Sequence, residues 1–211
     1  MTARHRATRE VDVAGLVLAG GRARRMGGED KGLIPLAGRP MVEHVLERIR
    51  PQVDEIVISA NRNRRLYARY GHPVIEDREG GYPGPLAGIL SGLLATHQPW
   101  LAVVPCDSPF LPEDLVDRLL RSALAASAEL AVVHDGSRLQ PLFALIHRSL
   151  LTDLRAFVAA GGRKVDTWCA QQRMATTDLS DQPAAFLNIN TPEDRAALES
   201  QPARGRTNPT P

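Results

Sequence analysis

Residues 17–31, with the sequence VLAGGRARRMGGEDK, combine glycines and basic side chains in a way that suits polyphosphate binding. They overlap an apolar run, Val13 to Leu18, that indicates a buried parallel strand. Glycines at the end of a strand let backbone N–H groups approach a ligand closely, and several such groups can surround phosphate oxygens. Four basic side chains add positive charge to the same segment: Arg22, Arg24, Arg25 and Lys31. The pattern predicts a loop that holds a polyphosphate.

Asp107 offers a carboxylate at the end of a second apolar segment. It follows the run Trp100 to Pro105, which indicates another strand, and it lies between two prolines in the sequence PCDSP. Mg²⁺ prefers oxygen ligands and usually takes one or two carboxylates together with substrate phosphates. The alternative is a helix N-cap, but Pro112 and Glu113 place the next helix several residues later. Asp107 is therefore the predicted metal ligand, and the neighbouring Cys106 is predicted to be a small buried residue.

Strand and helix patterns alternate between these two segments and beyond them. The further predicted strands are 55–60, 73–76, 130–133, 141–147 and 186–189, and the predicted helices are 40–50, 62–70, 86–96, 112–127, 150–160 and 164–172. Repeated strand–helix units imply an α/β fold, a single Rossmann-like domain with a mainly parallel central sheet and helices on both faces. We expect the domain to span residues 11–200. Residues 1–10 and 201–211 are polar and lack periodicity, so they are predicted to be disordered tails.

Polar residues follow each predicted strand, and their positions test this fold. Ligands of such sheets bind outside the carboxyl ends of the strands. Ser59 and Asn61 follow the second strand, where a base or ribose could be recognised, although Asn61 also suits a simple turn. Asp77 follows the third strand, and Asn188 and Asn190 end the last one. We expect these side chains to meet Asp107 and the glycine-rich loop at one edge of the sheet.

Composition excludes several other classes of protein. The 211 residues are 43% hydrophobic and 24% charged, which is ordinary for a globular enzyme. A net charge of +2 is too small to indicate a nucleic-acid partner. The two cysteines have no CxxC spacing, so neither a disulfide framework nor a zinc site is expected. No apolar run is long enough to cross a bilayer and no signal-peptide core is visible, so we expect no membrane partner and a cytoplasmic location.

The glycine-rich loop resembles LAGGxxxRMGxDK, the signature of nucleotidyltransferases that make molybdenum cofactor dinucleotides, and the molybdenum cofactor guanylyltransferases are the most similar group. Further shared motifs are SANR at 59–62, YPGPLAG at 82–88, PCDSP at 105–109, VHDG at 133–136, Gln140-Pro141 and NINTPE at 188–193. The resemblance covers about residues 13–199. Relatives that transfer cytidylate tend to carry LAAG where this chain has LAGG, which favours GTP by analogy.

The resemblance implies an activity and a set of site residues. The enzyme would transfer GMP from GTP to the phosphate of molybdopterin (molybdenum cofactor) with release of pyrophosphate, using Mg²⁺. Lys31 and Asp107 would be catalytic, and Asp107 would hold the metal. The implied nucleotide-binding residues are Leu18, Ala19, Gly20, Gly21, Arg25, Lys31, Ser59, Asn61, Asp77 and Asp107. Molybdenum-insertion proteins and molybdoenzyme chaperones are the implied protein partners.

The acceptor is expected on a second group of residues. Arg163 and Lys164 open the predicted helix 164–172, and helix N-termini favour phosphate. The same resemblance places Asn188 and Asn190 beside the acceptor, although solvated cations and a helix cap at Asn190 would give the same pattern. A cytidylyltransferase, a sugar-phosphate nucleotidyltransferase and a non-catalytic cofactor chaperone remain alternatives, but Lys31 and Asp107 argue against the chaperone.

Overall fold

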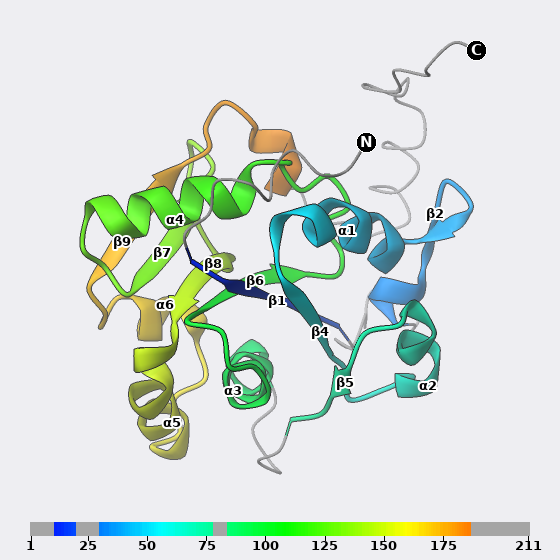
Figure 1. Ribbon diagram of the computed structural model, residues 1–211, viewed down its shortest axis with the longest axis horizontal. Helices are drawn as coiled ribbons and strands as arrows, with labels where there is room; N and C mark the ends of the chain where they lie inside the picture. Colours follow the sequence, from blue (N-terminus) through cyan, green and yellow to red (C-terminus); the bar gives the residue numbers. More distant parts are fainter. Residues whose placement is uncertain (1–10, 20–29, 78–83, 187–211) are drawn as a thin grey trace.

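A seven-stranded sheet in the order β5-β4-β1-β6-β8-β7-β9 forms the centre of the fold (Figure 1). The structure is a computed structural model, and it describes residues 11–19, 30–77 and 84–186. Its strands are β1 (Val13–Leu18), β4 (Glu55–Ser59), β5 (Val74–Ile75), β6 (Trp100–Pro105), β7 (Leu130–His134), β8 (Leu139–His147) and β9 (Met174–Asp178). β1 pairs in parallel with β4 and β6, whereas β8 is antiparallel to both of its neighbours. The predicted mainly parallel sheet is confirmed.

Helices cover both faces of this sheet, as Figure 1 shows. They are α1 (Met41–Ile49), α2 (Arg64–Tyr67), α3 (Pro85–Ala95), α4 (Leu115–Ala125), α5 (Leu151–Ala159) and α6 (Val165–Cys169). Successive side chains of a strand point to opposite faces. Val17 of β1 accordingly joins the apolar core with α1 and α4, and Leu16 joins the core with α3, α5 and α6. Both layers are therefore anchored on the same central strand.

Short elements connect these layers. A two-stranded hairpin, β2 (Pro35–Leu36) and β3 (Arg39–Pro40), precedes α1. The 3₁₀ turns are η3 (Lys31–Leu33), η4 (Arg50–Gln52), η5 (Ala68–Tyr70), η6 (Arg148–Leu150) and η7 (Pro183–Phe186). The predicted helix 62–70 begins only at Arg64, because Asn63 takes a left-handed conformation (φ 52°), and it is divided into α2 and the turn η5.

Two strand predictions near the C-terminus differ from the structure. Strand β9 was not predicted, because it contains only one large apolar residue, and its inward side chains Ala175 and Thr177 are small. It pairs in parallel with β7 at the edge of the sheet. The strand predicted over 186–189 is wrong at its first residue, since Phe186 ends the turn η7. Residues 187–189 lie outside the described part of the chain.

Helix α3 approaches the sheet closely through two glycines. A Cβ atom at Gly92 would lie 2.7 Å from Cδ2 of Leu16, and a Cβ at Gly88 would lie 2.8 Å from both Cδ2 of Leu18 and Oγ of Ser59. The helix therefore lies directly on the ends of β1 and β4. Gly88 and Gly92 serve helix–strand packing.

Gly92→Ala should lower the free energy of unfolding by about 1 kcal/mol, because overpacking costs about 1–3 kcal/mol and the gain in helix propensity returns about 1 kcal/mol. Chemical denaturation measures this change. Leu16→Val removes the opposing methyl groups and is the matched partner. It should cost less stability in the Gly92→Ala background than in the unaltered protein, and equal costs in the two backgrounds would contradict the proposed overlap.

Candidate active site

The carboxyl ends of four parallel strands share one edge of the sheet, as predicted. β5, β4, β1 and β6 lie side by side and run in the same direction. Their hydrogen bonding continues past the strand ends, since Ala19 N–H donates to the Ser59 carbonyl (2.8 Å) and Cys106 N–H donates to the Leu18 carbonyl (3.0 Å). The backbone that leads into each predicted site segment is therefore held in register.

Lys31 and Asp107 meet at this edge. Lys31 Nζ donates to Asp107 Oδ2 at 2.9 Å, and the two side chains are only 22% and 11% exposed. Helix α4 begins at Leu115 with Asp114 as its N-cap, so Asp107 is free of the capping role considered from the sequence. Partial burial strengthens the attraction between two opposite charges, because little water screens them. The two predicted catalytic residues thus form one ion pair.

A second buried carboxylate, Asp30, lies directly before Lys31. It is 5% exposed and accepts hydrogen bonds from the Tyr67 hydroxyl (2.5 Å) and from Nδ2 of Asn63 (3.1 Å). Burial raises the pKa of Tyr67 far above its usual value, and the charge of the Asp30 carboxylate and the hydrogen bond to it add to the rise, so the phenol stays protonated. Sequence reasoning missed this group, since Tyr67 follows Asp30 by 37 residues.

Asn61 and Asp77 form a third group beyond β4 and β5. Asn61 Nδ2 donates to Asp77 Oδ2 (2.6 Å), and its carbonyl oxygen accepts the Asp77 N–H (3.0 Å). Burial raises the pKa of the Asp77 carboxyl, and the hydrogen bond from Asn61 opposes that rise. The other oxygen, Oδ1, is buried without a hydrogen-bond partner among the described residues. Such an oxygen is costly unless a donor or a metal reaches it.

Leu18 and Ser59 pack against helix α3 at this edge of the sheet. Ser59 is 4% exposed, and its Oγ and the Leu18 side chain lie against Gly88 of α3. The thiol of Cys106 has a strongly raised pKa because it is buried, which agrees with the predicted structural role of this cysteine. Ser59 is therefore packed under the helix, and its possible contact with a nucleotide stays a prediction.

The backbone of the turn that contains the predicted acceptor cations passes near the start of α3. A Cβ at Gly84, which takes φ +146°, would be 3.9 Å from the Arg163 carbonyl oxygen. Arg163 and Lys164 are both exposed. The predicted helix 164–172 is present but shorter, since α6 spans only Val165–Cys169. Because α6 is so short, its N-terminus contributes little to phosphate binding. The acceptor prediction therefore depends on the charges of Arg163 and Lys164.

Five predicted site residues lie outside the described part of the chain: Gly20, Gly21, Arg25, Asn188 and Asn190. Within the described residues, His, Cys, Asp and Glu side chains do not gather in groups of three that could hold a metal ion. A carboxylate such as Asp107 still fits Mg²⁺, because this ion commonly takes one or two protein carboxylates and completes its shell with phosphates and water.

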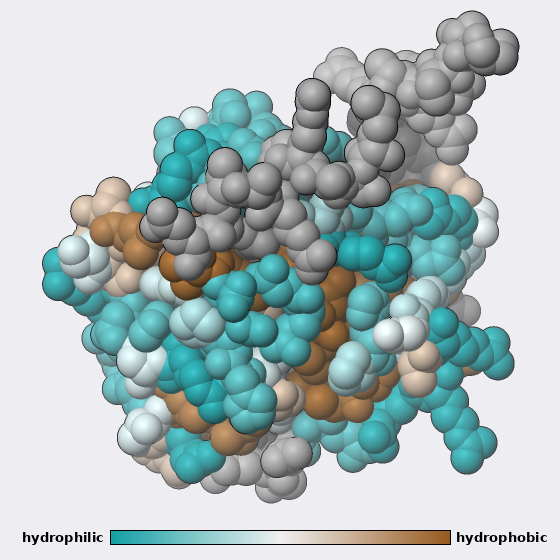
Figure 2. Space-filling view, viewed as in Figure 1, coloured by the Kyte–Doolittle hydropathy of each residue, from teal (hydrophilic) through white to brown (hydrophobic). Residues whose placement is uncertain are grey.

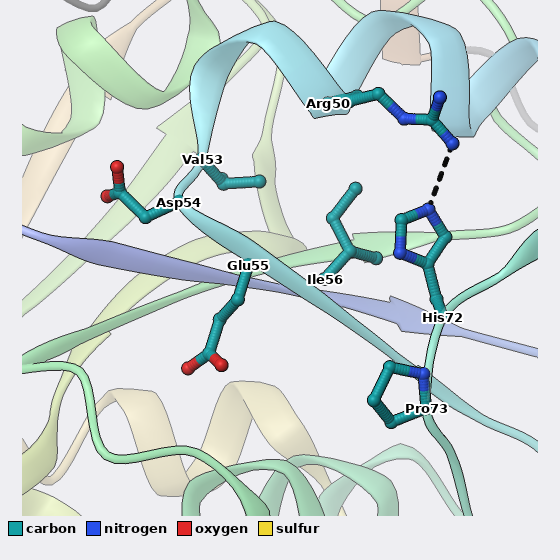
Figure 3. Close-up of a pocket in the computed structure, with 7 residues that line it drawn as sticks. All are labelled: Arg50, Val53, Asp54, Glu55, Ile56, His72 and Pro73. Atoms are coloured by element: carbon teal, nitrogen blue, oxygen red, sulfur yellow. Dashed lines mark hydrogen bonds between the residues drawn. The ribbon is translucent and has the colours of Figure 1, made fainter.

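A hollow of about 300 Å³ lies at the opposite edge of the sheet, in front of the amino ends of β4 and β5. In the face of the molecule that Figure 2 draws, apolar surface lies among hydrophilic residues near the middle. The hollow is lined by Arg50, Val53, Asp54, Glu55, Ile56, His72 and Pro73 (Figure 3). Arg50 Nη2 and His72 Nε2 are 3.1 Å apart, and burial lowers the pKa of His72. The described site residues lie at the other edge, so this hollow is separate from them.

Comparisons with known proteins agree with this arrangement. The model of the MobA-like NTP transferase domain matches residues 15–175. A molybdenum cofactor guanylyltransferase from Shewanella piezotolerans is 48% identical over 94% of this chain and 97% of its own length. Another from Shewanella halifaxensis is 51% identical over 90% of this chain and 94% of its own length.

Solved structures share the fold. Molybdopterin-guanine dinucleotide biosynthesis protein A from Archaeoglobus fulgidus has a TM-score of 0.75 and 25% identity, covering 88% of this chain and 96% of that one. A CMP:2-keto-3-deoxy-manno-octonic acid synthetase has a TM-score of 0.66 at 13% identity, covering 90% and 97%. In the part of the chain that is described, no helix has the length and apolar character of a membrane span. The family match, the close relatives and the shared fold together establish that this chain is a nucleotidyltransferase of the MobA-like NTP transferase family.

Proposed function

We propose that this enzyme transfers GMP from GTP to the phosphate of molybdopterin or its molybdenum-loaded form. An oxygen of the acceptor phosphate attacks the α-phosphorus of GTP, the bond from that phosphorus to the bridging oxygen of the β-phosphate breaks, and pyrophosphate leaves. The contact between Lys31 and Asp107 at the carboxyl edge of the sheet carries this proposal. The names of the Shewanella relatives, which are about half identical to this chain, support the choice of substrates.

An acceptor phosphate is already a nucleophile, so the protein has mainly to align the reactants and balance their charge. Lys31 supplies a cation for the charge that develops near the α-phosphate. Asp107 supplies the carboxylate for Mg²⁺, which would neutralise the phosphates as a Lewis acid. Lys31 and Asp107 neutralise each other before substrate arrives, at 2.9 Å.

Asp77 is well suited to recognise a guanine base. A carboxylate accepts hydrogen bonds only, and the N1–H and N2–H groups of guanine are adjacent donors. β5 is two strands from β1, so at ordinary strand spacing Asp77 lies roughly 10 Å from the line of β1. That offset matches a nucleotide with its phosphates over β1 and its base over β4 and β5. Asp77 Oδ1, which is without a described partner, would gain one there.

Arg163 and Lys164 would hold the acceptor phosphate near the start of α3. Both cations are exposed and lie in the turn beside Gly84. The predicted acceptor residues Asn188 and Asn190 belong to the same proposal. Because the reaction consumes GTP, we place it in the cytoplasm, with molybdenum-insertion proteins and molybdoenzyme chaperones as the partners that supply the acceptor and receive the product.

Lys31→Ala should lower kcat by about a hundredfold and change the KM for GTP much less, because its charge matters most in the transition state. Asp107→Asn should lower kcat at least as much at saturating Mg²⁺. Steady-state assays with GTP and molybdopterin measure both. Glu113→Gln, which alters an exposed carboxylate paired with Arg48, is the control and should retain full activity. Full activity of Asp107→Asn would remove this residue from the site.

Asp77→Asn should lower kcat/KM for GTP about tenfold and narrow the preference for GTP over CTP, because it replaces one acceptor oxygen by a donor. Competition assays with both nucleotides test this. The adjacent Glu76→Gln breaks only a surface pair with Arg64 and should leave the preference unchanged. An unaltered preference in Asp77→Asn would contradict the proposed base contact, and faster turnover with CTP than with GTP in the unaltered enzyme would indicate a cytidylyltransferase.

Arg163→Ala should weaken binding of molybdopterin and leave the affinity for GTP near its original value. Equilibrium binding of each ligand separates the two effects. Arg155→Ala, which removes another exposed arginine from the preceding helix α5, is the matched control. An equal loss for both ligands, or for neither, would contradict the acceptor assignment.

A further inference from the structure

A buried network of hydrogen bonds fixes the turn that contains Lys31. Asp30 and Lys31 begin this turn, where Leu33 N–H donates to the Asp30 carbonyl (3.0 Å) and Ile34 N–H donates to the Lys31 carbonyl (3.2 Å). The Asp30 carboxylate points inward and accepts one hydrogen bond at each oxygen, from Tyr67 at 2.5 Å and from Asn63 at 3.1 Å. The turn is thereby tied to α2 and its N-cap, by hydrogen bonds that span 37 and 33 residues of the chain.

Close contacts around this network leave the backbone of the turn little room to move. A Cβ at Gly32 would lie 2.5 Å from the Tyr67 hydroxyl oxygen and 3.1 Å from Sγ of Cys106. The backbone of the turn therefore passes directly over the Tyr67 hydroxyl. It also lies against Cys106, the residue that precedes Asp107. Tyr67 is fully buried, so its hydroxyl has no water as an alternative partner.

Asn63 is specialised for the same contact. It precedes α2 in a left-handed conformation (φ 52°, ψ 28°) and makes no side-chain cap to that helix. Its carbonyl accepts from the N–H groups of Leu66 and Tyr67, while its side-chain amide donates to Asp30. Asparagine tolerates the left-handed region better than most residues. A residue that usually caps a helix is here directed at a carboxylate.

We propose that Tyr67 and Asn63 are positioning residues for catalysis, because they fix Asp30 and thereby hold Lys31 at the place where it meets Asp107 and the substrate phosphates. This inference rests on the role proposed for Lys31. The chemical step depends on the position of the Lys31 ammonium to within a fraction of an ångström, and the network removes the freedom of the turn to move it. Neither residue needs to touch the substrate.

Tyr67→Phe removes one hydroxyl and retains the ring. It should lower kcat about tenfold and change the KM for GTP less than about twofold, since a small displacement of a catalytic group mainly affects the transition state. Asn63→Gly preserves the left-handed backbone, removes the amide and should act in the same direction. Tyr70→Phe, three residues away and hydrogen-bonded to Glu43, is the matched control and should retain full activity. Melting temperatures identify any loss caused by unfolding.

A double-mutant cycle distinguishes positioning through Lys31 from a general structural effect. In a Lys31→Ala background, Tyr67→Phe should reduce the remaining kcat by no more than about twofold, because the group that it positions is gone. A full tenfold loss in that background would overturn the positioning role. If Lys31→Ala alone retained normal kcat, the role proposed for Lys31 would fail as well, so the two failures are distinguishable.

A spectroscopic test is independent of turnover. The sequence contains only two lysines, Lys31 and Lys164, so reductive ¹³C-methylation labels these two side chains and the N-terminal amine, and Lys164→Arg and Lys31→Ala assign the lysine resonances. Tyr67→Phe and Asn63→Gly should shift the Lys31 resonance, and Tyr70→Phe should leave it in place. An unchanged Lys31 resonance in Tyr67→Phe would overturn the proposal even if activity declined.

Discussion

The contact between Lys31 and Asp107 is the constraint on which the rest of the site depends. The two residues are 76 positions apart, and their charged groups are 2.9 Å apart in a partly buried place. Loss of hydration penalises each of these partly buried charges, and the attraction between them offsets that penalty in the ligand-free site. In the proposed reaction each charge gains another partner, Lys31 from the phosphates and Asp107 from Mg²⁺. The pair thus maintains charge balance before and after substrate arrives.

Parallel strands explain why so much of the site could be predicted from the sequence. Lys31 and Asp107 each follow an apolar strand, and neighbouring parallel strands bring their carboxyl ends to one edge. Asp77 follows the same rule at the end of β5. No local sequence pattern predicts which side chains pair across that edge. The Asn61–Asp77 hydrogen bonds, for example, depend on how β4 and β5 align, whereas from the sequence alone Asn61 also fits a simple turn.

The errors in prediction have physical causes of the same kind. Strand β9 is held by its pairing with β7, and its small inward residues give no apolar signal. The predicted helix 62–70 satisfies the helical pattern, but Asn63 leaves it to contact Asp30. No local pattern marks Asp30 as buried, because a carboxylate in a polar segment is usually solvated. Its 5% exposure becomes evident only when Tyr67 lies against it.

The use of lysine is informative in a chain that otherwise uses arginine. The sequence has 26 basic residues other than histidine, and all but Lys31 and Lys164 are arginine. Arginine presents a planar fork of five donors, whereas lysine presents a compact charge with three donors that can turn freely. In the proposed reaction the Lys31 ammonium meets a phosphate beside Asp107, and a compact charge that can rotate makes this second contact with little rearrangement. The second lysine lies in the turn assigned to the acceptor, so both compact cations belong to the proposed site.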